Sequence, residues 1–140
     1  MQRILIIDDE TFVREALQRV LSCKETTVVG AADANCGFAA LRESPVDLAI
    51  VDVVLPDMDG AEAIRLIRRD YPAVRIIAIS GGGNFGLHAY RPEAISTRAY
   101  LAACSAAGAD AVLPKPFETG ELRSVMDRVF STARPTAELR

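Results

Sequence analysis

A short apolar run that ends on a single carboxylate is the feature that most constrains the fold of this chain. Leu48 to Val51 reads Leu-Ala-Ile-Val, and Asp52 follows it directly. Consecutive apolar residues without alternation are typical of a strand that is buried on both faces of a sheet. The next residues, Val-Val-Leu-Pro-Asp-Met-Asp-Gly, form a turn-rich segment that ends at Gly60 and leads into a helical pattern. Asp52 is therefore expected at the mouth of a buried strand, where an acid usually performs chemistry.

The same alternation of a short apolar run and a helical pattern extends along the whole chain. Together with 48–52, the predicted strands are 4–7, 27–31, 74–80 and 109–113, and the predicted helices are 11–21, 34–43, 61–70, 93–107 and 119–130. In the first helix, Phe12 is expected to face inward together with Leu17 and Leu21. Strands that alternate with helices predict a doubly wound α/β fold, a five-stranded parallel sheet with five helices distributed over both faces.

Polar side chains stand at the predicted carboxyl ends of four of these strands. They are Asp8 and Asp9, Asp52, Ser80 and Lys115. In an open parallel sheet, ligands bind at this edge, so we expect the five side chains to converge there. Three neighbouring carboxylates repel one another unless a cation joins them, and a site made of oxygen ligands suits Mg²⁺, for which Mn²⁺ could substitute. An ionised aspartate held in this way can attack phosphorus and form an aspartyl phosphate, with the lysine and the serine hydroxyl neutralising the transferred oxygens.

These residues resemble the receiver domain of two-component response regulators. The resemblance extends from about Arg3 to Phe130 and rests on four motifs: Asp8-Asp9, Asp52 with the segment that follows it, Ser80, and Lys115-Pro116-Phe117. It implies a flavodoxin-like sheet with strand order 2-1-3-4-5. It also implies that Asp52 accepts a phosphoryl group from a phosphohistidine on a sensor histidine kinase or a histidine phosphotransfer protein. In the same way, it implies a phosphate contact for Lys115 and movement of Ser80 toward the phosphate.

The resemblance also implies how the metal is held. Mg²⁺ would be bound by Asp9, Asp52 and the backbone carbonyl of Val54, while Asp8 would act mainly through a water molecule. The peptide bond between Lys115 and Pro116 is expected to be cis, as is common in the family.

The sequence departs from the family pattern where the phosphorylation signal is read out. The family usually carries Tyr or Phe three residues before its lysine, but Val112 stands there in this chain. The separation between Ser80 and Lys115 is also longer than usual, and the excess falls in residues 81–92. Our hypothesis is that this enlarged loop, which begins with Gly81, Gly82 and Gly83, takes part in the switch, and that an aromatic residue in it replaces the missing one.

Composition and charge limit the classes of partner. The formal net charge is −3 and no basic block stands out, which argues against direct binding of nucleic acid. The apolar run 4–7 is too short for a signal peptide or a membrane span. The three cysteines, Cys23, Cys36 and Cys104, are interpreted as small buried residues of a cytoplasmic protein.

The domain organisation follows from the same patterns. Residues 1–131 are expected to form the receiver domain and residues 132–140 a flexible tail, without an output domain. Such a chain would act by changing its affinity for a downstream protein or by relaying the phosphate, and its last two helices offer a surface for a homodimer.

An enzyme is the alternative reading of the same site. A Mg²⁺-dependent phosphatase or phosphotransferase could also use an aspartyl phosphate intermediate. Hydrolases that resemble the haloacid dehalogenase family need a second acid two residues after the nucleophile, and here that residue is Val54. Valine cannot transfer a proton, so the sequence favours a signalling domain over an enzyme.

Overall fold

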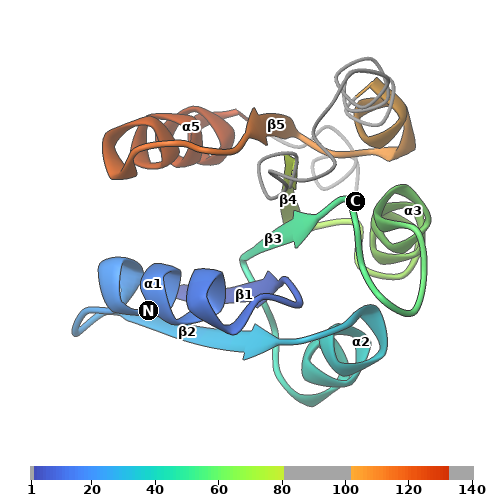
Figure 1. Ribbon diagram of the computed structural model, residues 1–140, viewed down its shortest axis with the longest axis horizontal. Helices are drawn as coiled ribbons and strands as arrows, with labels where there is room; N and C mark the ends of the chain where they lie inside the picture. Colours follow the sequence, from blue (N-terminus) through green and yellow to red (C-terminus); the bar gives the residue numbers. More distant parts are fainter. Residues whose placement is uncertain (1, 81–101, 133–140) are drawn as a thin grey trace.

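A parallel sheet with helices on both faces forms the protein in the computed structural model, which describes residues 2–80 and 102–132 (Figure 1). Its strands lie in the order β2-β1-β3-β4-β5, and all pairs are parallel. The strands are β1 (Gln2–Ile7), β2 (Thr26–Ala31), β3 (Leu48–Asp52), β4 (Arg75–Ser80) and β5 (Ala111–Pro114). The helices are α1 (Thr11–Leu21), α2 (Ala34–Glu43), α3 (Gly60–Asp70) and α5 (Thr119–Ser131), and residues 102–107 are also helical. The predicted fold class and strand order are confirmed.

The sheet separates two apolar cores, because side chains of a strand point alternately to its two faces. In β3, Ala49 and Val51 pack with α2 and α3, whereas Leu48 and Ile50 pack with α1 and α5. Every residue of β3 is buried. Full burial of a side chain such as that of Ile50 contributes roughly 1.5 to 3 kcal/mol relative to its exposure. The central strands are therefore held from both sides, which fixes the positions of the residues at their ends.

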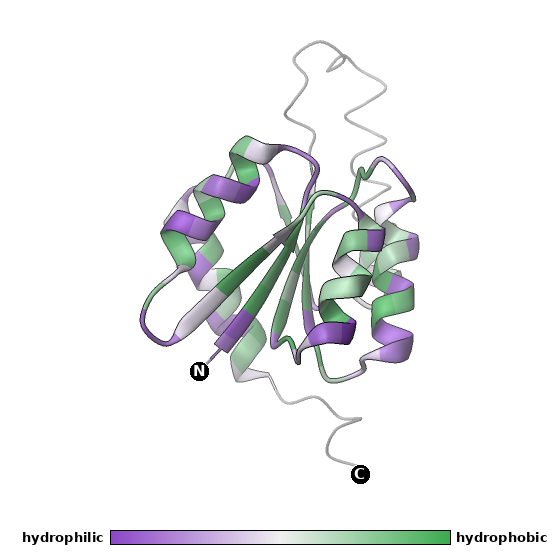
Figure 2. Ribbon diagram, turned by 90° about the horizontal axis from the view of Figure 1, so that it is seen from below, coloured by the Kyte–Doolittle hydropathy of each residue, from purple (hydrophilic) through white to green (hydrophobic). Residues whose placement is uncertain are grey.

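Polar and apolar residues alternate along the helices, as the purple and green stretches of ribbon in Figure 2 show. In α3, the buried residues Ala63, Ile64 and Ile67 face the sheet, while Glu62 and Arg65 form an exposed ion pair of 2.6 Å. A helix of period 3.6 with this pattern gains most of its stability from its apolar stripe. None of the helices in residues 2–80 and 102–132 combines the length and apolar composition that crossing a bilayer requires.

The prediction for Phe12 is wrong, since its side chain is 80% exposed. The buried residues of α1 are Leu17 and Leu21. Phe12 and Leu21 are nine positions apart, which at about 100° per residue places them on opposite sides of a helix. The apolar stripe read from the sequence was too wide to be buried completely, and Phe12 stood at its outer margin.

Two of the three cysteines also differ from the prediction. Cys104 is buried as expected, and burial raises the pKa of its thiol to about 11. Cys23 and Cys36 are exposed. Cys23 lies in the short turn between α1 and β2, where it forms an isolated bridge with Thr26, and Cys36 lies in the first turn of α2. Neither position is covered by a neighbouring element within the described residues.

One arginine ties α3 to the segments that lead into β4 and β5. The guanidinium group of Arg68 donates to the carbonyl oxygen of Val74 at 2.6 Å and twice to that of Gly108, at 2.8 and 3.2 Å. It also donates to Asp110 Oδ2 at 2.8 Å, and the same oxygen accepts the backbone N–H of Ile76 at 2.8 Å. The positive φ of Gly108, 122°, is a conformation that favours glycine. This network joins the end of α3 to the starts of β4 and β5.

Candidate functional site

The carboxyl edge of the sheet carries a cluster of polar side chains that are almost completely buried. Asp8 directly follows β1, Asp52 ends β3, Ser80 ends β4, and Lys115 directly follows β5. The exposed fractions are 0% for Asp8, 3% for Asp52 and 1% for Ser80. Parallel pairing brings these ends together, because Asp52 lies opposite Ile79 and Ser80 lies opposite Pro114. The predicted convergence at one edge of the sheet is confirmed.

The ammonium group of Lys115 lies among three carboxylates. Its Nζ is 3.1 Å from Asp8 Oδ2, 3.3 Å from Asp52 Oδ2 and 3.4 Å from Glu10 Oε1. The lysine side chain is itself only 11% exposed. A buried ammonium group without partners is unstable, and here the carboxylates of Asp8 and Asp52 supply them. The lysine therefore contacts side chains that lie between 63 and 107 positions before it in the sequence.

The two buried aspartates, Asp8 and Asp52, are each oriented by a local turn of the same type. Asp8 Oδ1 accepts the backbone N–H of Glu10 at 2.9 Å, and Asp52 Oδ1 accepts the backbone N–H of Val54 at 2.9 Å. Such a hydrogen bond between an aspartate and the amide two residues later is a common Asx turn. In both residues the other oxygen, Oδ2, is left to face Lys115. The backbone of each turn thus aims one carboxylate oxygen at the same point.

The charges at this edge do not balance. Burial, and after it the negative charge of Asp8, raise the pKa of Asp52 to about 7, although Lys115 and the Val54 amide oppose the shift. Burial by itself would lower the pKa of Lys115, but Asp52 and Asp8 outweigh it, so that this pKa is raised. The side chain of Lys115 therefore stays positively charged. The carboxylates around it carry more negative charge than this one ammonium group neutralises. Perturbed carboxyl groups of this kind are concentrated at functional sites.

A group of three carboxylates could hold a cation at the same edge. One oxygen from each of Asp8, Asp9 and Asp52 can be chosen so that all lie within 4.8 Å of one another. Asp9 is the exposed member, so the group opens toward solvent on its side. Oxygen ligands that leave room for water are what Mg²⁺ prefers, and the raised pKa of Asp52 is the response expected of such a group without its cation. The residues present fit a divalent cation.

A close backbone contact builds the connection between β3 and α3. The backbone N–H of Gly60 donates to the carbonyl oxygen of Val53 at 3.0 Å, and Val54 forms an isolated bridge with Asp59. A Cβ atom on Gly60 would lie 2.4 Å from Val53 Cα and 2.6 Å from the carbonyl oxygen of Asp52, closer than real contacts allow. Only glycine allows α3 to begin this close to the strand that carries Asp52.

The same connection also holds α2, which the sequence analysis did not anticipate. Asp57 Oδ1 and Oδ2 accept the backbone N–H groups of Ala34 and Asn35, each at 2.9 Å. Asp33 accepts the N–H of Cys36 at 2.8 Å and completes the cap. Desolvation by itself would raise the pKa of Asp57, but the hydrogen bonds from the backbone amides of Ala34 and Asn35 outweigh it, so that this pKa is lowered. Asp57 caps the start of a helix that begins 23 residues before it, and no local spacing in the sequence indicates such a contact.

Comparisons with known proteins agree with this geometry. The family model described as "Response regulator receiver domain" matches residues 4–127. The chain belongs to the response regulator receiver domain family. Receiver domains are signalling domains, and phosphorylation and Mg²⁺ binding are typical of the family.

Individual relatives show the same similarity. The chain is 31% identical over 136 residues to "DNA-binding transcriptional regulator NtrC" of Azospirillum brasilense, an alignment that covers 97% of this chain and 26% of that protein. It is 31% identical over 133 residues to "Response regulator MprA" of Mycolicibacterium vanbaalenii, covering 95% of this chain and 52% of that protein. It therefore spans between a quarter and about half of these curated relatives. A receiver domain protein (CheY-like) from Methanospirillum hungatei has a crystal structure with a TM-score of 0.74 and 26% identity, covering 94% of this chain and 95% of that one.

The positions expected to act as a switch in this receiver domain are only partly described. Val112 lies in β5 opposite Ala78 and is half-buried against the core on the side of α2 and α3. The backbone N–H of Lys115 donates to the carbonyl oxygen of Ser80 at 3.2 Å, and the Lys115-Pro116 peptide bond is cis, as expected. Gly81, Gly82 and Gly83, with the aromatic residues of the predicted loop, lie outside the described residues.

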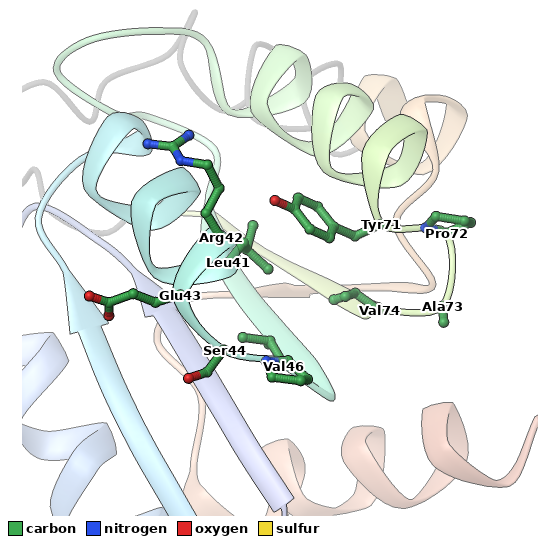
Figure 3. A pocket seen from close by; sticks show the side chains of 10 residues that line it. Leu41, Arg42, Glu43, Ser44, Val46, Tyr71, Pro72, Ala73 and Val74 are labelled. Carbon is green, nitrogen blue, oxygen red and sulfur yellow. The ribbon is translucent and has the colours of Figure 1, made fainter.

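A groove of about 750 Å³ lies at the opposite edge of the receiver domain. Leu41 and Val46 line one side, from the end of α2 and the approach to β3, and Tyr71 and Val74 line the other, from the end of α3 and the approach to β4 (Figure 3). It lies where β3 and β4 begin, whereas the carboxylates lie where these strands end. The groove therefore takes no part in the chemistry of the carboxylate cluster.

Proposed function

We propose that this receiver domain accepts a phosphoryl group on Asp52 from a phosphohistidine of a sensor histidine kinase or a histidine phosphotransfer protein. The observation that carries the proposal is the position of Asp52 Oδ2, buried at the end of β3 and 3.3 Å from the Lys115 ammonium group. An acid in this position has no role in packing, and it is paired with the cation that a phosphoryl oxygen requires.

The transfer exchanges one bond to phosphorus for another. An oxygen of the ionised Asp52 forms a bond to phosphorus, and the bond from phosphorus to the histidine nitrogen breaks. The imidazole, which carries a proton on its other nitrogen, keeps the electron pair and leaves as a neutral ring. Lys115 then neutralises charge on the transferred oxygens, and the buried hydroxyl of Ser80 donates a hydrogen bond to one of them. The Val54 amide keeps the carboxylate oriented through its hydrogen bond of 2.9 Å.

Asp8, Asp9 and Asp52, with the backbone carbonyl of Val54, are the residues that would hold Mg²⁺, or Mn²⁺ in its place. When bound, the cation supplies positive charge that stabilises the oxygens of the transferred group. The cluster of carboxylates and the raised pKa of Asp52 support this assignment. Asp8 contacts Lys115 as well, so it links the lysine to the metal site.

Phosphorylation would change the affinity of the domain for a downstream protein. Val112 is half-buried and has a small aliphatic side chain, so this position cannot supply the inward movement of an aromatic ring. We propose that the response starts at Ser80 and passes into the segment that begins with Gly81, Gly82 and Gly83. The balance of charge gives no reason to invoke direct contact with nucleic acid, and we propose self-association as a further output.

A phosphodonor experiment tests the proposal. The protein is incubated with a phosphorylated histidine phosphotransfer domain and Mg²⁺, and its intact mass is followed over time. We expect the mass of one acid-stable, base-labile phosphoryl group, which is absent in Asp52→Asn and present in the control Asp127→Asn, an exposed acid of α5. Repeated turnover with release of inorganic phosphate from small phosphate esters would instead indicate a phosphatase. A phosphoryl group that remains in Asp52→Asn would contradict the assignment.

A further inference from the structure

Glu10 is an acid at the rim of the site, and it has no role in the proposed chemistry. Its Oε1 lies 3.4 Å from Lys115 Nζ, and its side chain is 41% exposed. Asp8 and Asp52 contact the same ammonium group, but their side chains are 0% and 5% exposed. Glu10 therefore approaches Lys115 from the solvent side, the side from which a phosphodonor must enter.

The contact with Lys115 replaces the ordinary role of an acid at this position. Glu10 is the N-cap residue of α1, yet among the described residues its side chain makes no capping hydrogen bond. Its backbone is fixed, because its N–H donates to Asp8 Oδ1 at 2.9 Å and its carbonyl accepts the N–H of Arg14 at 3.1 Å. A side chain that could satisfy the first turn of the helix extends toward the lysine instead.

We propose that Glu10 is a specificity-determining residue that disfavours small anionic phosphodonors relative to a phosphohistidine presented by a protein. The proposal rests on the proposed function of Asp52. A free anionic donor must pass the Glu10 carboxylate and must also draw Lys115 away from it. A protein donor meets the same barrier but offsets it with contacts outside the site. Glu10 acts through charge and through the position of Lys115 and does not itself react.

Acetyl phosphate and phosphoramidate are suitable probes, because they differ in negative charge at neutral pH. With acetyl phosphate, Asp52 forms a bond to phosphorus, the bond from phosphorus to the acetyl oxygen breaks, and acetate leaves with the electron pair. With phosphoramidate, which carries less negative charge, Asp52 again forms a bond to phosphorus and the bond from phosphorus to nitrogen breaks. The nitrogen, which already carries three protons, keeps the electron pair and leaves as ammonia. A carboxylate at the entrance should slow the first donor more than the second.

The isosteric substitution Glu10→Gln removes the charge and keeps the volume. With Mg²⁺ present, we expect the phosphorylation rate at low acetyl phosphate concentration to rise about threefold to tenfold, a size set by screened Coulomb repulsion in a solvent-exposed site. The rise with phosphoramidate should be smaller, and both rises should shrink as salt is added. The matched control Glu15→Gln, an exposed acid of the same helix, should leave both rates unchanged. Glu10→Asp, which keeps the charge but shortens the reach to Lys115, should lie between wild type and Glu10→Gln.

An equal rise with both donors, or no rise with either, would overturn the inference. A second measurement needs no metal and no donor: the NMR order parameter of the Lys115 ε-methylene should fall in metal-free Glu10→Gln and not in Glu15→Gln. If the wild-type protein takes up phosphate from neither small donor nor from a phosphotransfer domain, the proposed function fails. The order parameter still tests Glu10 in that case, and an unchanged value would show that it does not hold the lysine.

Discussion

The buried carboxyl group of Asp52 is held in surroundings that oppose its charge. Burial and Asp8 together raise its pKa to about 7 from an ordinary value of 3.8, although Lys115 lies 3.3 Å away. Natural proteins keep such unfavourable groups mainly where function requires them. We therefore expect the ionised side chain of Asp52, on which the proposed chemistry depends, to lower the stability of the metal-free domain.

Asp52→Asn should stabilise the metal-free protein at alkaline pH. A carboxyl group whose pKa is raised by folding binds its proton more tightly in the folded state, so its contribution to stability is full below about pH 4 and is lost as the pH rises to about 7. Asparagine carries no such proton. We expect the free energy of unfolding of Asp52→Asn to exceed that of wild type at pH 8 by about 1 to 3 kcal/mol, and the gain to be absent at pH 4.

Urea unfolding in the presence of a chelator measures this difference. The exposed control Asp127→Asn should show no comparable dependence on pH. A variant that is equally stabilised at both pH values, or destabilised at pH 8, would show that the charge of Asp52 is compensated in the folded protein.

Prediction of the site from sequence succeeded where the fold itself brings residues together. Asp8, Asp52, Ser80 and Lys115 could be assigned to one edge because each follows an apolar run and parallel strands end on the same side. The role of Glu10 could not be assigned, because its contact with Lys115 depends on the direction of a side chain across 105 positions. The run of three acids after the first strand was the only signal of it in the sequence.

At the scale of elements, the connection between β3 and α3 sets the position of the site. It begins at Asp52, and its Gly60 packs against the backbone of the strand that it has just left. The bounds of α3 and of β3 were close to those predicted, since glycine and proline mark turns clearly. The orientation of α1 was predicted less well, because hydropathy alone does not show which edge of a wide apolar stripe reaches solvent. Phe12 stands at the edge of this stripe that is exposed to solvent.

Gly60→Ala should be strongly destabilising, whereas Gly120→Ala should not. The added Cβ at residue 60 would lie 2.4 Å from Val53 Cα, so the strand end and the helix would have to separate. We expect a loss of about 2 to 4 kcal/mol in the free energy of unfolding. At Gly120, in the first turn of α5, no atom lies within 4 Å of the added Cβ, and alanine favours a helix. Chemical denaturation of both variants checks the pair, and similar stabilities would contradict the close packing at Gly60.

At the scale of the whole molecule, hydrogen bonds between distant segments complete the two cores. Arg68 joins the end of α3 to the starts of β4 and β5, and Arg75 joins β4 to the end of α5, donating to Val129 at 2.8 Å and to Thr132 at 2.7 Å. The layers of the fold can be predicted from hydropathy. The contacts of these arginines cannot, since a partly buried arginine looks the same in the sequence as an exposed one.

Arg68→Ala should cost about 2 to 4 kcal/mol in the free energy of unfolding, because it leaves the carbonyl of Gly108 and the carboxylate of Asp110 without this donor. Arg65→Ala is the matched control in the same helix. Its pair with Glu62 is exposed, so its removal should have little effect. Thermal and urea unfolding distinguish the two, and equal effects would contradict a special role for Arg68.

The hydrogen bonds of Asp57 have a practical consequence. Its carboxylate joins the loop after β3 to the backbone amides of Ala34 and Asn35, which lie in the first turn of α2. Any shift of that loop on loading of the site changes the length of these two hydrogen bonds, to which amide proton frequencies are sensitive. We therefore expect the two amides to act as a spectroscopic reporter of any change at Asp52 that moves this loop, without labelling of the site itself.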